Sequence, residues 1–325
     1  MALFLRRDEG GQIMRVTWIE SGKKAFLIGI TFLAASCAAP EYQGSSEVLQ
    51  ASAMVSSPAP SPAPSPAMPR AREQPRRLTD KEAEQYVQYA MMASNAYHDW
   101  PNRYYFPLQV IGWHQIDWHG NPTQQPTFTD MKTGLAFDIF ANDKTKDIVV
   151  AFRGTDDLQD WISNLAIYKS PQYEQARYHF GELIKKFRGR QFMVTGHSLG
   201  GGLALHVSAT FPAVKAVVFD SSPRVFDHSD RKDPADRLSI HQNHEVLEVI
   251  RTHWPAFLSL VDARNIYETD FDFCTRPDHR MDLLAKGLLE MASKNRKIFK
   301  KLLGRITPPT TDTMPPCPTL LKKDL

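Results

Sequence analysis

A glycine-flanked serine constrains the fold of this chain more than any other feature. A Gly-His-Ser-Leu-Gly motif at residues 196–200 follows an apolar run at residues 191–195 and leads into small, apolar residues with helical spacing. This pattern predicts a strand, a sharp turn and a helix, with the Ser198 hydroxyl presented above a sheet edge. Gly196 and Gly200 fit because such a turn leaves little room for neighbouring side chains. Taken alone, the motif also fits an ordinary helix start after a buried strand.

Composition places the chain among globular proteins. Its 325 residues are 42% hydrophobic, which is enough for a sizeable core. The formal net charge is +3, and the basic residues are scattered rather than clustered on one stripe. We therefore expect no nucleic-acid partner.

The N-terminal segment predicts an export signal. Two lysines precede the apolar run at residues 25–35, which is too short to span a bilayer and suits a signal peptide. The run ends in Leu-Ala-Ala-Ser-Cys, which resembles the lipobox of bacterial lipoproteins. That resemblance implies that residues 1–36 are removed and that the lipidated Cys37 anchors the protein to a membrane of the cell envelope. Ala38, by the same resemblance, favours the outer membrane. A plain secretory signal, giving a periplasmic or secreted protein, is the alternative.

Composition also divides the rest of the chain. Residues 37–77 are rich in Pro, Ala and Ser, which predicts an extended tether of roughly 3 Å per residue. Residues 78–304 form the expected folded domain, and residues 305–325 a proline-rich tail. Cys274 and Cys317 could form a disulfide or stay free, because the sequence does not give the distance between them.

Hydrophobic periodicity predicts alternating strands and helices in the domain. Residues 99–135 read as hairpin or lid material, and 225–243 as a polar loop. Helices are expected near 79–97, 157–167, 171–187, 199–210 and 279–303, and strands near 135–140, 147–152, 191–197, 214–219, 245–250 and 265–268. The order predicts an α/β fold, a mostly parallel sheet flanked by helices on both faces.

A second motif precedes the serine by about forty residues. The predicted strand at 147–152 ends in Phe-Arg-Gly-Thr, followed by Asp-Trp-Ile and Asn-Leu at residues 160–165. Together with Gly-His-Ser-Leu-Gly, this resembles the class three, or fungal-type, lipases of the α/β-hydrolase superfamily. The resemblance implies an oxyanion hole formed by the backbone N–H groups of Thr155 and Leu199, and it implies neither a metal nor an organic cofactor. It also implies that His197 points away from the site.

The general base is expected after the acid in chain order. His279 opens the last predicted helix as His-Arg-Met-Asp-Leu-Leu, which resembles the segment that carries the base in related lipases. His253 is the second candidate.

The acid departs from the family pattern. These lipases place it in an Asn-x-x-Asp-x-Val-Pro segment after a strand, but residues 251–255, which follow the strand predicted at 245–250, hold no carboxylate. Asp220, after the strand at 214–219, is therefore the predicted acid, with Asp262 and Asp227 as alternatives.

These residues predict a serine hydrolase that cleaves carboxylic esters of lipids through an acyl-enzyme, as a triacylglycerol lipase or carboxylesterase. A phospholipase A-type enzyme or a thioesterase would share every motif. A third alternative is an inactive lipid-binding lipoprotein, because the usual position of the acid looks empty.

Overall fold

The computed structural model describes residues 4–7, 13–16, 75–98, 103–155, 171–211, 213–225, 237–252, 254–271 and 279–309. The chain divides into two units, Met1–Pro66 and Ala67–Leu325. The first contains an antiparallel pair of short strands, β1 (Phe4–Arg7) and β2 (Ile13–Val16). Cys37, Cys274, Cys317, most of the predicted signal peptide and tether, and the end of the tail lie outside the described residues, so the statements about them stay predictions.

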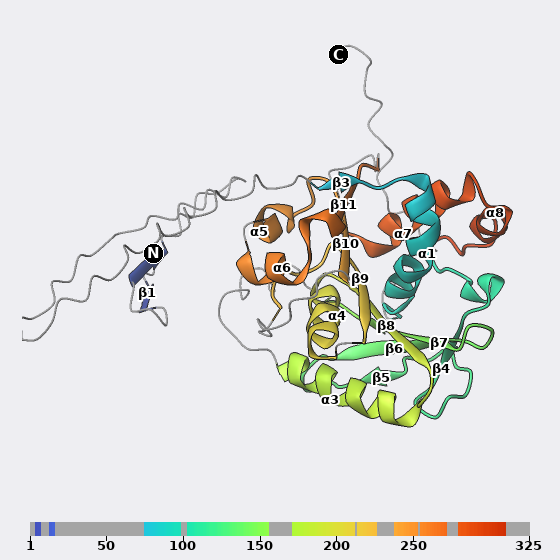
Figure 1. Cartoon of the computed structure of the whole chain (residues 1–325), viewed down its shortest axis with the longest axis horizontal. Coiled ribbons are helices and arrows are strands. Elements are labelled where there is room, and N and C mark those ends of the chain that lie inside the picture. Colours follow the sequence, from blue (N-terminus) through green and yellow to red (C-terminus); the bar gives the residue numbers. More distant parts are fainter. Residues whose placement is uncertain are drawn as a thin grey trace, which may run out of the picture. The chain divides into compact units, whose positions relative to one another are not determined.

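Within the described part of the second unit, nine strands form one sheet in the order β3-β11-β10-β9-β8-β7-β6-β4, and β5 also pairs with β6 (Figure 1). Neighbours from β3 to β7 are parallel, whereas β6 is antiparallel to β7, β4 and β5. The strands are β3 (Arg76–Arg77), β4 (His114–Ile116), β5 (Phe128–Thr129), β6 (Ala136–Asn142), β7 (Asp147–Phe152), β8 (Gln191–His197), β9 (Lys215–Phe219), β10 (Arg237–Gln242) and β11 (Ile266–Thr269).

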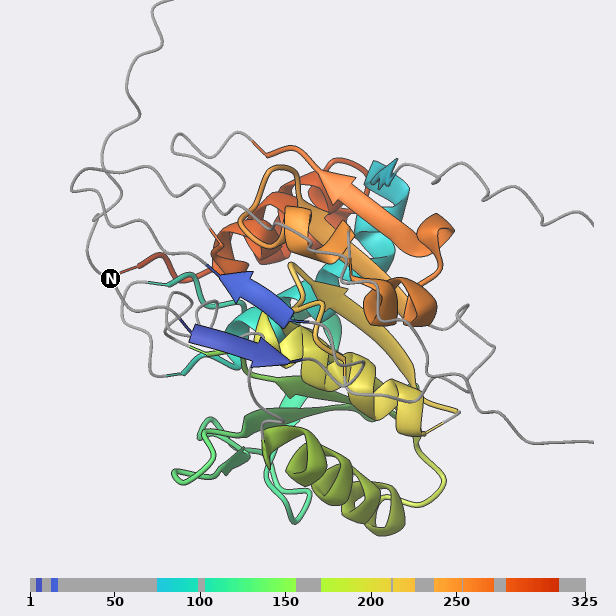
Figure 2. The ribbon, with the colours of Figure 1, turned by 90° about the vertical axis from the view of Figure 1, so that its left-hand side faces the viewer.

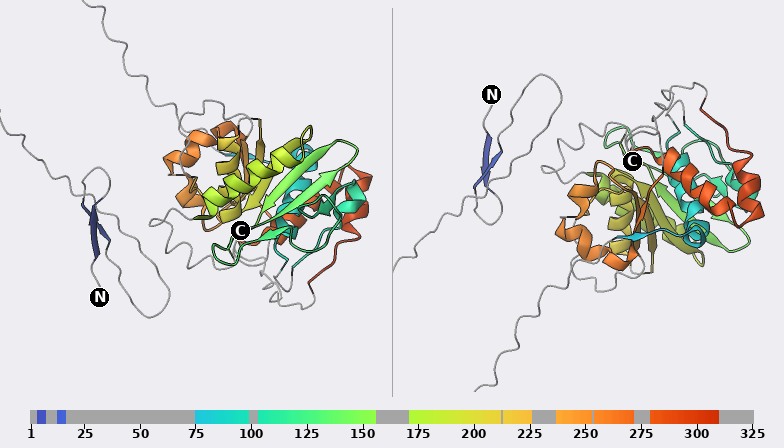
Figure 3. Two further views of the ribbon diagram at one scale, coloured as in Figure 1. Left: turned by 90° about the horizontal axis from the view of Figure 1, so that it is seen from below. Right: turned by 90° about the horizontal axis from the view of Figure 1, so that it is seen from above.

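Helices cover both faces of this sheet. One face carries α3 (Pro171–Lys186) and α4 (Leu199–Thr210), which cross the sheet on the side turned to the viewer in Figure 2. The other carries α1 (Asp80–Asn95), α7 (Met281–Ser293) and α8 (Lys297–Leu303). Figure 3 shows α3 nearest the viewer from below, and α7 and α8 beside α1 from above. Short helical segments complete the fold: η1 (Leu108–Ile111), α5 (Glu248–Thr252), α6 (Pro255–Leu260) and η2 (Ala263–Asn265).

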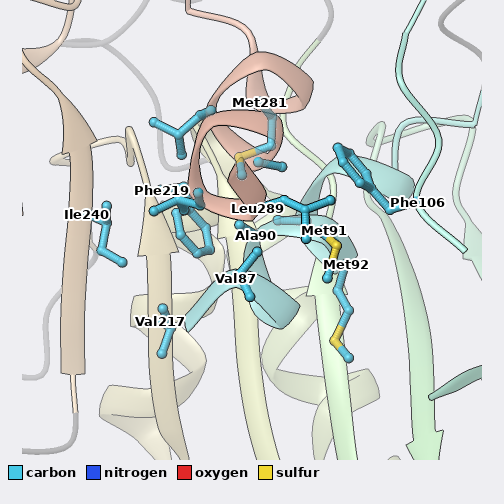
Figure 4. Packing of buried hydrophobic residues seen from close by; sticks show 14 of the residues in the cluster. Val87, Ala90, Met91, Met92, Phe106, Val217, Phe219, Ile240, Met281 and Leu289 are labelled. Atoms are coloured by element: carbon cyan, nitrogen blue, oxygen red, sulfur yellow. The ribbon is translucent and has the colours of Figure 1, made fainter. Parts of the chain in front are cut away.

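Alternation along the strands explains the two layers. In β9, Val217 and Phe219 belong to the core under α1 and α7, and Ala216 and Val218 to the core under α3 and α4. Figure 4 shows the first of these cores, with Met91 and Met92 of α1, Met281 of α7 and Phe219 of β9 among its residues. The predicted α/β class, with a mostly parallel sheet between helical layers as in an α/β-hydrolase, is confirmed.

The start of the folded domain follows from a capping box. Thr79 accepts a hydrogen bond from the Glu82 backbone N–H at 3.3 Å, and the Glu82 carboxylate accepts one from the Thr79 N–H at 2.9 Å. The predicted first helix therefore begins where expected. Arg76 and Arg77, at the end of the predicted tether, instead add β3 to the edge of the sheet beside β11.

Two predicted elements are wrong. The strand expected at 245–250 is absent from this described stretch, where α5 begins at Glu248, and the true strand is β10, inside the region predicted as a polar loop. Every residue of β10 is buried, including the polar residues Arg237, Ser239 and His241. Because polar residues are typical of loops, the sequence pattern did not indicate a central strand here. The last helix is also not continuous, because α7 ends at Ser293 and α8 begins at Lys297.

The other expectations can be placed briefly. The hairpin of β6 and β7 is confirmed, with Phe140 opposite Val149. Residues 99–135 contribute η1, β4 and β5, whereas the helix predicted at 157–167 lies outside the described residues. At the start of the predicted tail, Thr307 pairs with Tyr105. Among the helices that the structure describes, none combines the length and apolar character needed to cross a bilayer.

Candidate active site

Ser198 lies in a strained turn between β8 and α4. Its φ of 57° and ψ of −128° are a conformation that L-residues rarely adopt. Its backbone N–H donates to the Phe219 carbonyl at 3.2 Å, and its carbonyl accepts from the Ser222 N–H at 2.8 Å. These bonds to the neighbouring chain hold the turn.

The two glycines around Ser198 make this turn sterically possible. A Cβ at Gly196 would collide with the backbone of Gly200, and one at Gly200 would collide with the Phe152 carbonyl and lie 2.8 Å from the Arg153 carbonyl carbon. Both glycines therefore stand where backbone segments touch, as the sequence predicts.

His279 lies beside this turn, two residues before α7 begins. Its ring centroid is 4.5 Å from that of His197, at an interplanar angle of 39°. The His279 Nε2 and the Ser198 Oγ are both buried, and neither has a hydrogen-bond partner among the residues that the structure describes. The structure thus brings the predicted base to the predicted nucleophile without joining them by a hydrogen bond.

The other nitrogen of His279 has a partner that sequence reasoning missed. Glu245 Oε2 lies 3.0 Å from His279 Nδ1, and the same oxygen accepts the Leu247 backbone N–H at 2.9 Å. The other oxygen, Oε1, pairs with the Arg251 guanidinium, whose Nη1 donates to the Ser221 carbonyl at 2.7 Å. Glu245 and Arg251 are both buried. This arrangement fixes a carboxylate against one side of the imidazole.

The electrostatics of Glu245 keep it ionised. Burial by itself raises the pKa of a carboxyl, but here the Arg251 charge and the hydrogen bond from His279 outweigh burial and lower the pKa of Glu245 to about 2. A charged carboxylate therefore faces His279.

Asp220, the predicted acid, lies close by but is bound elsewhere. It directly follows β9 with a φ of 38°, and its Oδ1 accepts the Gln242 backbone N–H at 2.8 Å. Its Oδ2 is buried with no partner within the described part of the chain, and no hydrogen bond joins its carboxyl to His279. Burial, followed by the negative charge of Glu245, raises the pKa of Asp220 well above its ordinary value. The site therefore favours the charge of Glu245 and disfavours that of Asp220.

The wrongly predicted strand at 245–250 explains why the sequence analysis did not identify Glu245. The true strand is β10, and the segment that follows it is Asn243-His244-Glu245-Val246, which does contain a carboxyl. The sequence signal for this acid is the asparagine followed closely by an acidic residue, directly after 237–242. Of the alternatives, Asp262 bonds to Arg264, whereas Asp227 and His253 lie outside the described residues.

The loop after β7 touches the serine turn and carries Thr155. A Cβ at Gly154 would lie 3.2 Å from the Ser198 Cβ and 2.7 Å from the His197 carbonyl oxygen, so the two segments are in close contact. Leu199 is the first residue of α4, where backbone N–H groups are not used by the helix. The structure therefore brings both predicted oxyanion-hole residues to the serine turn, one from each segment.

A buried tyrosine ties the two segments together. The Tyr97 hydroxyl accepts the Gly154 backbone N–H at 3.2 Å and lies 2.9 Å from His197 Nδ1. Burial, followed by the charge of His279, lowers the pKa of His197 well below its ordinary value, so His197 is neutral. The expectation that His197 points away from the site is wrong, because its ring contacts His279.

The two carboxyls predict opposite effects on stability. Glu245→Gln leaves Arg251 buried without its counter-charge, so we expect the free energy of unfolding at pH 7 to fall by about 3–5 kcal/mol. Asp220→Asn removes a carboxyl whose charged form the fold disfavours, so we expect equal or greater stability than wild type at pH 7. Urea titrations of the full chain measure both changes.

The pH dependence supplies the control. The stabilisation from Glu245 is present above its ordinary pKa of 4.5 and is lost as the pH falls toward about 2. The raised pKa of Asp220 has the reverse effect and costs stability as the pH rises above 3.8, so the advantage of Asp220→Asn grows from pH 4 upward. Equal destabilisation by both substitutions would contradict the assignment of charge.

Comparison with known proteins assigns this chain to a family. Residues 88–256 match the model of the phospholipase-like family described as the Tle-like phospholipase domain. The extracellular phospholipase A1 of Serratia liquefaciens is 38% identical over 183 residues, which cover 50% of this chain and 56% of that protein. The chain therefore spans little more than half the length of this curated relative.

Solved lipases show a more distant likeness. The lipase of Rhizopus microsporus var. chinensis is 20% identical, with 51% of this chain and 67% of that chain covered and a TM-score of 0.38. The Lip2 lipase of Yarrowia lipolytica is 16% identical, with 63% and 84% covered and a TM-score of 0.40. The fold assignment rests on the strand order and the serine turn described above.

The family match spans half of the chain and includes β8, the serine turn and Glu245. The predicted ester-hydrolysing domain is thus confirmed at the level of its family, while the assignment to class three stays a prediction. The chain belongs to the phospholipase-like family defined by the Tle-like phospholipase domain.

Proposed function

We propose that this protein hydrolyses acyl esters of phospholipids with a triad of Ser198, His279 and Glu245. The observation that carries the proposal is the 3.0 Å contact between His279 Nδ1 and a buried carboxylate, next to a serine held at positive φ. A carboxylate on Nδ1 leaves Nε2 of the same ring as the proton acceptor, and that nitrogen has no other partner among the described side chains.

The steps follow the standard chemistry of acyl transfer. His279 Nε2 takes the proton of Ser198 Oγ, which attacks the ester carbonyl. Glu245 holds the Nδ1 proton and stabilises the imidazolium, and Arg251 keeps Glu245 ionised. The backbone N–H groups of Leu199 and Thr155 are proposed to bind the oxyanion. The proton on His279 then passes to the departing alcohol, and water releases the fatty acid from Ser198.

Access to the nucleophile requires movement of the chain. Ser198 is only 2% exposed, so an ester carbonyl cannot reach Oγ in this conformation. A hydrogen bond between Ser198 and His279 that is missing here can form when substrate binds, because such contacts are often long in unliganded enzymes.

The first test is active-site labelling with a fluorophosphonate. We expect wild-type protein to be labelled and Ser198→Ala not to be. Glu245→Gln should slow labelling roughly a thousandfold or more, because the wrong imidazole tautomer then faces the serine. The matched substitution Asp220→Asn should leave the rate far closer to wild type.

The labelling results test both the enzyme assignment and the identity of the acid. Failure of the wild-type protein to label would overturn the enzyme assignment and favour an inactive lipid-binding protein. A larger loss for Asp220→Asn than for Glu245→Gln would return the role of the acid to Asp220. Far-UV circular dichroism of each variant separates lost chemistry from lost folding.

The substrate class can be tested with phospholipid vesicles that carry different acyl chains at the two glycerol positions. The phospholipase-like family match and the relative named phospholipase A1 favour release of the sn-1 fatty acid. We expect mass spectrometry to show this product, with slower turnover of triolein emulsions and of acyl-thioesters. Faster turnover of triolein would favour a triacylglycerol lipase, and preference for short aryl esters would favour a carboxylesterase. Ser198→Ala is the control for each substrate.

We further propose that the domain acts outside the cytoplasm, tethered to the outer membrane through a lipidated Cys37. The apolar run before Cys37 supports export, and the relative from Serratia liquefaciens is named extracellular. Metabolic labelling with a palmitate analogue should mark the wild-type protein but not Cys37→Ser. Export without labelling would support the periplasmic or secreted alternative.

A further inference from the structure

Three side chains converge at the serine turn, of which His197 and Asp220 are buried and His279 is partly buried. A ring nitrogen of His197, a ring nitrogen of His279 and a carboxylate oxygen of Asp220 lie within 4.8 Å of one another. His197 Nε2, His279 Nε2 and Asp220 Oδ2 each lack a hydrogen-bond partner among the described residues. We propose that these three side chains bind a transition-metal ion of the zinc type, which switches the site off.

The Nδ1 nitrogen of each imidazole already has a hydrogen-bond partner. His279 Nδ1 is bound to Glu245 at 3.0 Å, and His197 Nδ1 lies 2.9 Å from the Tyr97 hydroxyl. Metal-binding histidines almost always use one nitrogen for the metal and the other for a carboxylate, carbonyl or similar group that fixes the ring. Both rings therefore have the supporting contacts of metal ligands.

The donor atoms select the class of metal. Two imidazoles and one carboxylate suit zinc and similar ions, whereas calcium and magnesium prefer oxygen ligands alone. Bonds of about 2.0–2.2 Å place the ligand atoms of a tetrahedral site roughly 3.4 Å apart. Because the three atoms lie within 4.8 Å of one another, the side chains need to close by up to about 1.4 Å. On binding, the metal replaces the proton of Asp220, which leaves to solvent.

The effect on hydrolysis rests on the proposed function. A metal on His279 Nε2 occupies the lone pair that must accept the Ser198 proton. The nucleophile is then not activated, and removal of the metal restores it.

Binding is tested without catalysis in full-length Ser198→Ala protein, by calorimetric titration with Zn²⁺ and by the visible absorption of Co²⁺. We expect one tightly bound ion per chain and the intense bands of tetrahedral cobalt. Adding Asp220→Asn or His197→Gln should weaken binding about tenfold or more. The matched control is His244→Gln, because exposed His244 lies 3.9 Å from Glu248 and could form an adventitious surface site.

The outcomes separate the metal site from the proposed enzyme. Absence of binding, or binding weakened only by His244→Gln, would overturn the site. Zn²⁺ should slow fluorophosphonate labelling of wild-type protein, and chelation should restore it; unchanged labelling in saturating Zn²⁺ would overturn the switch. If Zn²⁺ binds at the three residues but the wild-type protein is never labelled by the fluorophosphonate, the metal site is supported and the proposed hydrolase activity is contradicted. Two ligand variants, Asp220→Asn and His197→Gln, are tested because either one could lose binding simply by failing to fold.

Discussion

The ion pair of Glu245 and Arg251 is the interaction on which the site depends. Both side chains are buried, and burying two charges is costly unless each is fully hydrogen-bonded. Here the carboxylate also binds His279 and the Leu247 N–H, and the guanidinium binds the Ser221 carbonyl. The pair connects α5 to the loop after β9 and, through His279, to the segment before α7. Removing either partner therefore disturbs the base as well as the core.

The parallel sheet brings these residues together. Ser198 follows β8, Asp220 follows β9 and Glu245 comes soon after β10, and these three strands are consecutive neighbours. Because the carboxyl ends of parallel strands meet at one edge of a sheet, chemistry gathers there. His279 reaches the same edge from the start of α7, and contacts between α1 and α7 hold that helix against the sheet (Figure 4). Chain order alone therefore sets much of the geometry.

The sequence was sufficient to predict the serine turn, because backbone sterics permit few alternatives to Gly196 and Gly200. It was also sufficient to select His279 for this place in the fold, because the order of motifs leaves few histidines after the predicted acid, while its role as the base stays a prediction. It was insufficient for Glu245, since that prediction depends on where β10 lies. In β10 the residues facing the α4 side are Arg237, Ser239 and His241, so the hydrophobic alternation that marks a strand is present on one face only.

The polar face of β10 has a physical reason once the buried ion pair is known. His241 lies in the field of Arg251, and burial together with that charge lowers the pKa of His241 to about 3, which keeps the ring neutral. Ser239, on the same face of β10, is uncharged as well.

The same constraint explains the state of Asp220. Among the described carboxyls, Glu245 is the one paired with Arg251, so the negative charge is favoured on Glu245 and disfavoured on Asp220. Asp220 also lies close to two imidazoles, in a backbone conformation that is strained for an L-residue. Strain and a buried oxygen that has no partner among the described residues are both costs that a purely structural aspartate would not need to bear. Their coincidence beside the nucleophile is the reason to assign Asp220 a role in ligand binding rather than in the triad.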